Sequence, residues 1–236
     1  MGTTITIEPG QNGTRRLVRL LSWLSPAFPI GGFAYSQGLE TAIATGTVTD
    51  RASLVAWIEG QMASGGLHTD ASFVGISLRA AQAHDIATLA EANALALALQ
   101  PSAERDKETR EQARSFVTSA AAWPLDLGED IARLLEGDMA LPVAFGTLAG
   151  SSAIAGIDAV AGYLNAYAGQ QIAVALRLVP LGQTEGLAAL AGLEPGICAL
   201  ADTAAAARLE TIGAIGYGTD IAAMRHEDLG TRIFRS

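Results

Sequence analysis

Apolar residues recur at intervals of three and four positions along most of the chain, the spacing that places them on one face of an α-helix. Leu54, Trp57 and Ile58 begin one such stripe, after a helix-capping residue at Thr49 or Asp50. Few segments are rich in Val, Ile, Thr and Tyr, as β-strands would be. The pattern therefore predicts an all-α fold.

Prolines, glycines and polar stretches divide this pattern into roughly ten helices. Residues 139–168 form the longest apolar segment and are expected to be a central helix that its neighbours approach closely. Residues 171–180 have the β-branched content of a strand, but without a visible partner strand they are predicted to be helical. The other predicted helices lie at 15–24, 33–44, 51–64, 70–84, 86–99, within 104–122, within 126–138, at 184–193 and at 195–213.

The chain shows no internal repeat, low-complexity linker or shift in composition, so a single domain is the simplest account of its organisation. Residues 1–14 are expected to be a disordered arm. Residues 15–215 are expected to form the helical domain, and residues 216–236 a flexible C-terminal tail.

Composition supports this picture and bears on location. Half of the residues are hydrophobic and many are alanine, which favours helices that pack closely through small side chains. Residues 139–157 are uncharged and long enough to span a bilayer, but their proline, glycines and serines favour a buried core helix. The N-terminus has no apolar signal-peptide region, and Cys198 is the single cysteine. We expect a cytoplasmic protein that does not enter a membrane.

The charges exclude several classes of function. The net charge is −9, Lys107 is the only lysine, and the arginines are scattered, so nucleic-acid binding is not expected. No glycine-rich phosphate loop surrounds Lys107, and no Gly-x-Ser-x-Gly motif is present. His68, His84 and His226 lack the spacing of metal ligands on a helix. No catalytic residue, cofactor or metal site within one chain is expected, although a metal site shared across an oligomer interface stays open.

Three clusters combine glycine turns with aromatic, amide or charged side chains: 29–40 (PIGGFAYSQGLE), 177–186 (RLVPLGQTEG) and 216–227 (GYGTDIAAMRHE). Each cluster is explained either as a well-capped helix end or as a binding element. Arg177 lies in an apolar run, where structural burial is favoured, so its guanidinium either pairs with a carboxylate or faces an interface.

Read together, these clusters resemble the signatures of the UreF family of urease accessory proteins. The matching stretches are SPAFPIGGFAYSQGLE at 25–40, LPVAFG at 141–146, RLVPLGQT at 177–184 and DIAAMRHE at 220–227, which is followed by RIFRS. They occur in order from about residue 20 to the end of the chain. One departure is Leu187, where the family often has glutamine after GQTEG.

The resemblance implies an all-α protein without catalysis of its own. Such proteins bind the accessory protein UreD (also called UreH) and the nickel-carrying GTPase UreG, often as a dimer, and the assembly delivers nickel to apo-urease. The tail at 216–236 would then order on the UreD partner. The expected partner-binding residues are Phe33, Tyr35, Ser36, Gln37, Glu40, Arg177, Gln183, Tyr217, Asp220, Met224, Arg225, His226 and Glu227.

Two other functions remain open as alternatives. The chain could regulate the UreG GTPase cycle by supplying a group in trans, as an arginine finger does, with Arg177 and Gln183 as candidates. It could also bind nickel on its own, without partners.

Overall fold

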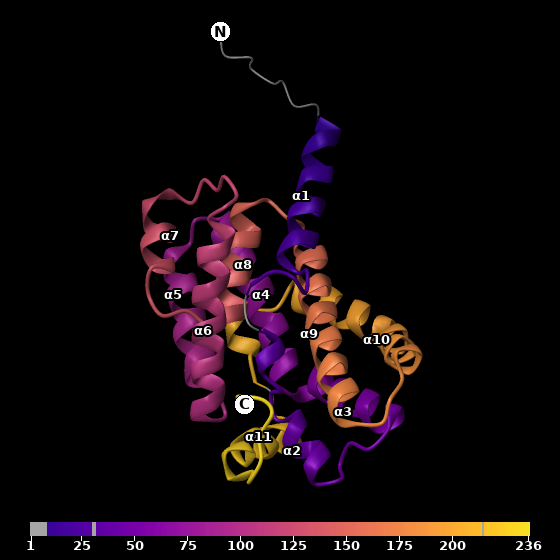
Figure 1. The fold of residues 1–236 in the computed structure, drawn as a ribbon. Helices are drawn as coiled ribbons and strands as arrows, with labels where there is room; N and C mark the ends of the chain where they lie inside the picture. Colours follow the sequence, from indigo (N-terminus) through magenta and orange to yellow (C-terminus); the bar gives the residue numbers. More distant parts are fainter. Residues whose placement is uncertain (1–8, 30–31, 214) are drawn as a thin grey trace.

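The computed structural model describes residues 9–29, 32–213 and 215–236, and every regular element in these ranges is helical (Figure 1). The all-α prediction is therefore confirmed. The helices are α1 (Pro9–Trp23), α2 (Leu39–Ala44), α3 (Arg51–Ser64), α4 (Gly66–Gln82), α5 (Ile86–Ala98), α6 (Ala103–Ala120), α7 (Gly128–Leu135), α8 (Leu141–Ser151), α9 (Gly156–Leu178), α10 (Gln183–Ala204) and α11 (Tyr217–Met224). Short 3₁₀ turns lie at Gly32–Ala34, Leu209–Thr211 and His226–Asp228.

Helix α8 lies at the centre of the fold, and every residue from Pro142 to Gly150 is buried. Helix α4 packs along it, with α5, α6 and α7 on one side of this pair and α3, α9 and α10 on the other (Figure 1). Helix α1 projects from one end of the molecule, and α2, α11 and the C-terminus lie together towards the other end (Figure 1). The expected central apolar helix is thus present, although it is shorter than predicted.

Glycines in α8 allow it to lie unusually close to α4. A Cβ atom built at Gly146 would lie 2.5 Å from the carbonyl oxygen of Val74, and one at Gly150 would overlap the carbonyl oxygen of Leu78. The two backbones are therefore in direct contact, and dispersion contacts accumulate along the whole helix pair. This confirms the expectation of close helix packing through small residues.

The prediction of one helix over 139–168 is wrong. Helix α8 ends at Ser151 and α9 begins at Gly156, and between them Ala153 adopts a left-handed conformation with φ of 52°. Glycine or asparagine usually occupies that conformation, and alanine gives no such signal, so the sequence does not indicate the turn. The break lets α9 run to Leu178, and so the helix predicted at 171–180 is the second half of α9.

The helices predicted at 184–193 and 195–213 are a single helix, α10, that ends at Ala204. Proline usually ends a helix because it lacks an N–H group and its ring crowds the preceding turn. Pro195 is exposed to solvent on the outer side of α10, while Ala189, Leu193 and Ile197 anchor the helix to the core on both sides of it. Core packing therefore outweighs the local cost of the proline.

Of the three N-terminal helices, α3 begins as predicted, and α1 and α2 begin at other residues. Asp50 caps α3, as expected, by accepting a hydrogen bond from the Ser53 backbone N–H (2.8 Å). The helix predicted at 33–44 is a 3₁₀ turn followed by α2, which begins only at Leu39. Helix α1 begins at Pro9, so residues 9–14 of the predicted disordered arm are helical, and residues 1–8 lie outside the described residues.

We predict that Gly146→Ala lowers the free energy of unfolding by about 1–3 kcal/mol, because the added methyl group forces α8 away from α4. Equilibrium urea denaturation measures this change. Gly60→Ala is the matched control, since Gly60 lies in α3 and a Cβ atom added there would meet no other atom within 4 Å. The control should gain up to about 1 kcal/mol from helix propensity. An equal loss in both variants would contradict close packing at Gly146.

Candidate functional site

The loop between the 3₁₀ turn and α2 contains two residues in the left-handed backbone conformation. Gln37 and Gly38 are both left-handed, with φ of 57° and 84°. At Gly38 a Cβ atom would also lie 2.8 Å from the backbone nitrogen of Ala223 in α11. The glycine therefore serves two needs, the turn itself and the close approach of the C-terminal helix.

Two glutamines of α9 fix this loop from the side of the core. Gln170 donates to the carbonyl oxygen of Tyr35 (3.2 Å), and Gln171 donates to that of Ser36 (3.1 Å). Gln171 is fully buried. Because buried carbonyl groups need donors, these side chains replace the hydrogen bonds that the loop cannot make within a helix.

The C-terminal segment, residues 216–236, returns to this loop and is held by the carboxylate of Glu40. That carboxylate accepts from the backbone N–H groups of Ile233 (2.7 Å) and Phe234 (3.1 Å). It also lies 3.0 Å from Nε2 of the fully buried His226, whose Nδ1 lies 2.7 Å from Glu104. Carboxylate oxygens only accept, so both contacts are hydrogen bonds when each ring nitrogen carries a proton.

A second carboxylate, that of Glu108 in α6, binds the very end of the described chain. It accepts from Ser236 Oγ (2.6 Å) and from Gln37 Nε2 (2.8 Å), and it forms an ion pair with Arg105. The carbonyl oxygen of Ser236 accepts from the backbone N–H groups of Ser36 (2.8 Å) and Gln37 (3.1 Å). The segment expected to be flexible is thus packed against the body of the fold.

Tyr35 completes the contact between loop, α6 and C-terminal segment. Its hydroxyl donates to Glu111 (2.7 Å) and accepts from Arg235 (3.2 Å), whose guanidinium lies over the Tyr35 ring at 5.4 Å. Burial, and then the hydrogen bond to Glu111, raise the pKa of Tyr35 well above its usual range. The same hydrogen bond holds the pKa of Glu111 below its usual value. Tyr35 therefore acts as a neutral donor inside the fold.

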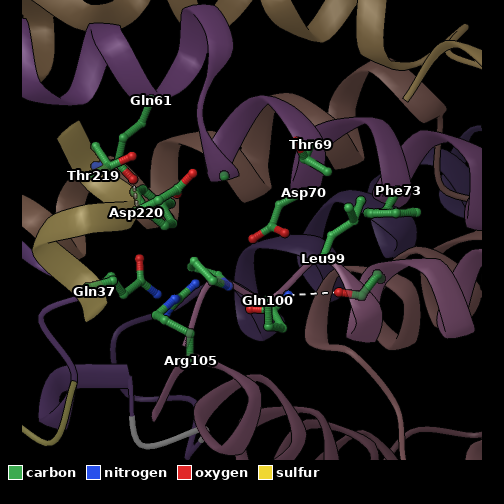
Figure 2. A pocket seen from close by; sticks show the side chains of 15 residues that line it. Gln37, Gln61, Thr69, Asp70, Phe73, Leu99, Gln100, Arg105, Thr219 and Asp220 are labelled. Atoms are coloured by element: carbon green, nitrogen blue, oxygen red, sulfur yellow. Dashed lines mark hydrogen bonds between the residues drawn. The ribbon is translucent and has the colours of Figure 1, made fainter. Parts of the chain in front are cut away.

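A polar cavity of about 80 Å³ lies beside this junction, and its walls come from the core and from α11 (Figure 2). Asp70, Arg105 and Asp220 line it, together with Gln61 and Tyr167. Burial raises the pKa of Asp70 to about 6 and also raises that of Asp220. The Gln61 side-chain N–H₂ group is buried and has no hydrogen-bond partner among the described residues. The cavity is roomy and polar enough to hold a few ordered waters.

Several large apolar side chains are exposed on the elements that meet at this junction. Phe33 is 74% exposed, Tyr217 is 73% exposed and Met224 is 49% exposed. Ile221 of α11 and Ile233 of the C-terminal segment are also exposed large hydrophobic residues. Large side chains of this kind on a rigid backbone are typical of protein–protein contacts.

The predicted partner-binding residues thus divide into two groups. The side chains of Phe33, Arg177, Gln183, Tyr217, Met224, Arg225 and Glu227 are exposed. Those of Tyr35, Ser36, Gln37, Glu40 and His226 are buried inside this chain, and Asp220 is half-buried at the cavity. The structure brings the first and third clusters together through the contacts of Glu40 and Gly38.

Arg177 does not fit the interpretation of a buried guanidinium. Its side chain is exposed, and it stacks over the ring of Phe234 with the guanidinium carbon 4.9 Å from the ring centre. The expectation of structural burial is therefore wrong, because Arg177 lies in the last turn of α9, where the helix meets the C-terminal segment. A cation over an aromatic ring satisfies the charge without a carboxylate.

Sequence reasoning missed the acidic residues of α6 that bind the C-terminal segment, since a charged helix face is ordinarily solvated. Glu104, Glu108 and Glu111 follow the spacing i, i+4, i+7, which places three carboxylates on one helix face. That spacing is the signal by which they could have been found. In the described ranges, no group of three or more His, Cys, Asp or Glu side chains is arranged to hold a metal ion.

Comparison with known proteins gives consistent results. The family model described as UreF matches residues 48–194. The chain is 46% identical over 220 residues to the urease accessory protein UreF of Rhizobium leguminosarum bv. viciae, an alignment that covers 93% of this chain and 96% of that protein. It is 45% identical over 227 residues to the protein of the same name from Rhizobium etli strain CIAT 652, with 96% and 99% of the two chains covered. It is 44% identical over 218 residues to that from Methylobacterium sp. strain 4-46, with 92% and 87% covered.

Asp70 at the cavity gives a prediction for stability against pH. Its folded pKa of about 6 lies above the usual 3.8, so the native state holds an extra proton between these values. Stability contributed by this group is therefore lost as the pH rises from about 4 to 6. Asp70→Asn should be more stable than the parent by roughly 2 kcal/mol at pH 7.5 and nearly equal to it at pH 4.

Chemical denaturation of both proteins at the two pH values measures this difference. Asp130→Asn serves as the control, because Asp130 is 71% exposed on α7 and should change stability little at either pH. A difference between Asp70→Asn and the parent that does not change with pH would show that Asp70 is charged in the fold throughout this range.

Proposed function

This chain belongs to the UreF family of urease accessory proteins, and from that premise we propose that it is a scaffold in urease maturation without catalysis of its own. In this proposal it binds UreD/UreH and the GTPase UreG, and through them apo-urease, so that nickel reaches the urease active site. It works in the cytoplasm, outside any membrane and without nucleic acid or a cofactor, and it self-associates.

One observation carries the proposal, namely that large apolar side chains are exposed on elements held by a buried network of hydrogen bonds. Phe33, Tyr217 and Met224 are each about half or more exposed, whereas Glu40 and Glu108 hold the end of the C-terminal segment by hydrogen bonds. Anchors on a fixed backbone lose little conformational entropy when a partner binds. We propose that this surface docks UreD.

In this proposal, the buried residues among those predicted to bind the partner act indirectly, by holding the exposed residues in position. Glu40 and His226 hold the C-terminal segment in place, and Gln37 shares the carboxylate of Glu108 with Ser236. In the proposal they are positioning residues, while Arg225 and Glu227, which are exposed close to Met224 in the chain, supply charges at the rim.

We predict that the double variant Tyr217→Ala and Met224→Ala weakens the complex with UreD at least tenfold while the helical content is unchanged, because both side chains are exposed in the free protein. Co-purification of tagged UreD with the co-expressed variant tests this, with circular dichroism as the check on folding. Binding equal to that of the parent would rule out this surface.

The matched control is Ile157→Ala, which removes a side chain of similar exposure (51%) at the start of α9, towards the opposite end of the molecule from α11 (Figure 1). It should leave UreD binding unchanged. An equal loss in the control would indicate a general effect of surface apolar residues rather than a defined docking site.

A second candidate function, regulation of the UreG GTPase in trans, is favoured by the exposure of Arg177. An arginine that supplies charge to a partner's nucleotide must be reachable from outside, and Arg177 is exposed on the last turn of α9. Gln183 is exposed at the start of α10. The aromatic contact with Phe234 argues that Arg177 also stabilises the C-terminal segment.

If Arg177 acts in trans, Arg177→Ala should reduce GTP turnover by UreG in the intact complex by about 10³-fold. Turnover is measured at saturating concentrations of each protein, after the complex has been confirmed by sizing. Arg208→Ala is the control, since Arg208 is equally a surface arginine and is 77% exposed. Unchanged turnover with a complete complex would exclude the trans role.

A further inference from the structure

His226 is a buried histidine with a carboxylate on each side of its ring. Its Nε2 atom lies 3.0 Å from the carboxylate of Glu40 in α2, and its Nδ1 atom lies 2.7 Å from that of Glu104 in α6. Ionised carboxylates accept hydrogen bonds and do not donate them, so a neutral ring, which has one N–H group, satisfies only one of the two. This geometry therefore needs one proton more than a neutral histidine supplies.

The ion pairs around the ring show which carboxylate depends on that proton. Three acidic side chains follow one face of α6, and each has an arginine within ion-pair distance. The pairs are Glu104–Arg232, Glu108–Arg105 and Glu111–Arg235. Glu40 is only 6% exposed, and among the described residues no Lys or Arg side chain forms an ion pair with it. His226 is therefore the group that can give Glu40 a positive partner.

The remaining charged groups near the ring do not replace this proton. Arg225, Glu227 and Asp228 flank His226 in the chain, but their side chains are exposed to water, where salt screens their charges. Asp220 of α11 lines the polar cavity and contributes a negative charge, not a positive one. The charge on the ring is thus set by Glu40 and by Glu104 with its arginine.

Loss of the proton replaces one attraction with a repulsion. A ring that keeps its hydrogen on Nε2 presents the lone pair of Nδ1 to Glu104, and the other tautomer presents a lone pair to Glu40. A lone pair held against a carboxylate in a buried site is costly, because no water separates the two. Glu40 also binds the backbone N–H groups of Ile233 and Phe234, so movement of the C-terminal segment relieves this cost.

We propose that Glu40, His226 and Glu104 form a proton-operated latch, in which the imidazolium holds the C-terminal segment against α2 and α6 and loss of its proton loosens the segment. Histidine is the side chain that ordinarily changes charge near neutral pH. Closing the latch takes up this proton. By linkage the closed state is therefore favoured as the pH falls towards about 6 and weakened as the pH rises, by at most tenfold per pH unit for one proton.

The latch goes beyond the proposed function, because it names a signal, the proton, and not a partner. It belongs to the isolated chain and is tested without any urease protein. Its failure would leave the proposal of UreD docking as it stands, and a failure of UreD docking would not affect the response of the latch to pH.

Hydrogen exchange of the Ile233 and Phe234 amides reports the latch directly, because both N–H groups donate to Glu40. Rapid-mixing hydrogen–deuterium exchange of the full-length protein measures their protection, which is then corrected for the intrinsic exchange rate at each pH. The corrected protection should fall at least tenfold between about pH 6 and about pH 8.5.

The amide of Ala144, which is bonded within α8, is the internal reference, because its exchange reports opening of the core. Asp70 titrates with a pKa of about 6 and acts on the stability of the whole fold. That titration should lower the protection of Ala144 only about twofold over the same pH range. A larger change at Ile233 and Phe234 is therefore local to the C-terminal segment.

Glu104→Gln separates a latch from a merely structural contact. The new amide can accept from Arg232 through its oxygen and donate to Nδ1 through its nitrogen, so a neutral ring then satisfies both of its neighbours. This variant should keep the amides of Ile233 and Phe234 protected at both pH values. His226→Gln removes the titrating group and should give low protection of the two amides at both pH values, with circular dichroism confirming that the helices are folded.

The matched control is His84→Asn, which removes an exposed imidazole at the end of α4. His84 has a φ of 52°, and asparagine tolerates that left-handed conformation. This variant should keep the pH dependence of the parent protein. Nitrogen-15 NMR of the imidazole rings gives the protonation state of His226, whose signals are identified by their loss in His226→Gln. The ring should carry two protons at about pH 6.

Three results would overturn the proposal. The first is protection of the Ile233 and Phe234 amides that follows that of Ala144 over the whole pH range. The second is a Glu104→Gln protein that keeps the pH dependence of the parent. The third is a His226 ring that carries a single proton at about pH 6 while the two amides are protected.

Discussion

The carboxylate of Glu40 is the constraint on which the candidate site depends. It is only 6% exposed, and a buried carboxylate without donors costs several kcal/mol. Its donors come from His226 and from the backbone of Ile233 and Phe234, almost two hundred residues later in the chain. The start of α2 and the end of the chain therefore stabilise each other, and neither is satisfied when the other is absent.

The helical scaffold fixes the relative positions of the groups that form this long-range contact. Gly146 and Gly150 bring α8 against α4, and α9 then presents Gln170 and Gln171 to the loop that precedes α2. Close-packed interiors deform little, so the loop is held at a fixed place relative to α6 and its carboxylates. The exposed side chains of Phe33, Tyr217 and Met224 lie on elements that this buried frame holds in place, which is how a protein proposed to act without catalysis can still have a defined functional site.

The site also shows why residues of a binding signature need not touch a partner. Ser36, Gln37 and Glu40 belong to the most distinctive stretch of the sequence, yet their side chains are engaged in internal hydrogen bonds. The exposed residues near them take their positions from these bonds. The contacts of Glu108 and Glu111 with the same junction went unrecognised, since a charged helix face usually points to water and only the spacing of its carboxylates indicated otherwise.

By itself the sequence determined the all-α class, the presence of a central apolar helix, most helix positions and the four stretches that resemble the family's signatures. These are local features, fixed by the periodicity of apolar residues and by glycine and proline chemistry. Tertiary structure alone decided the turn at Ala153, the continuation of α10 through Pro195, and the burial of His226 between Glu40 and Glu104. The physical reason is that these features depend on packing and hydrogen bonds between residues far apart in the chain, whose energies outweigh local conformational preferences.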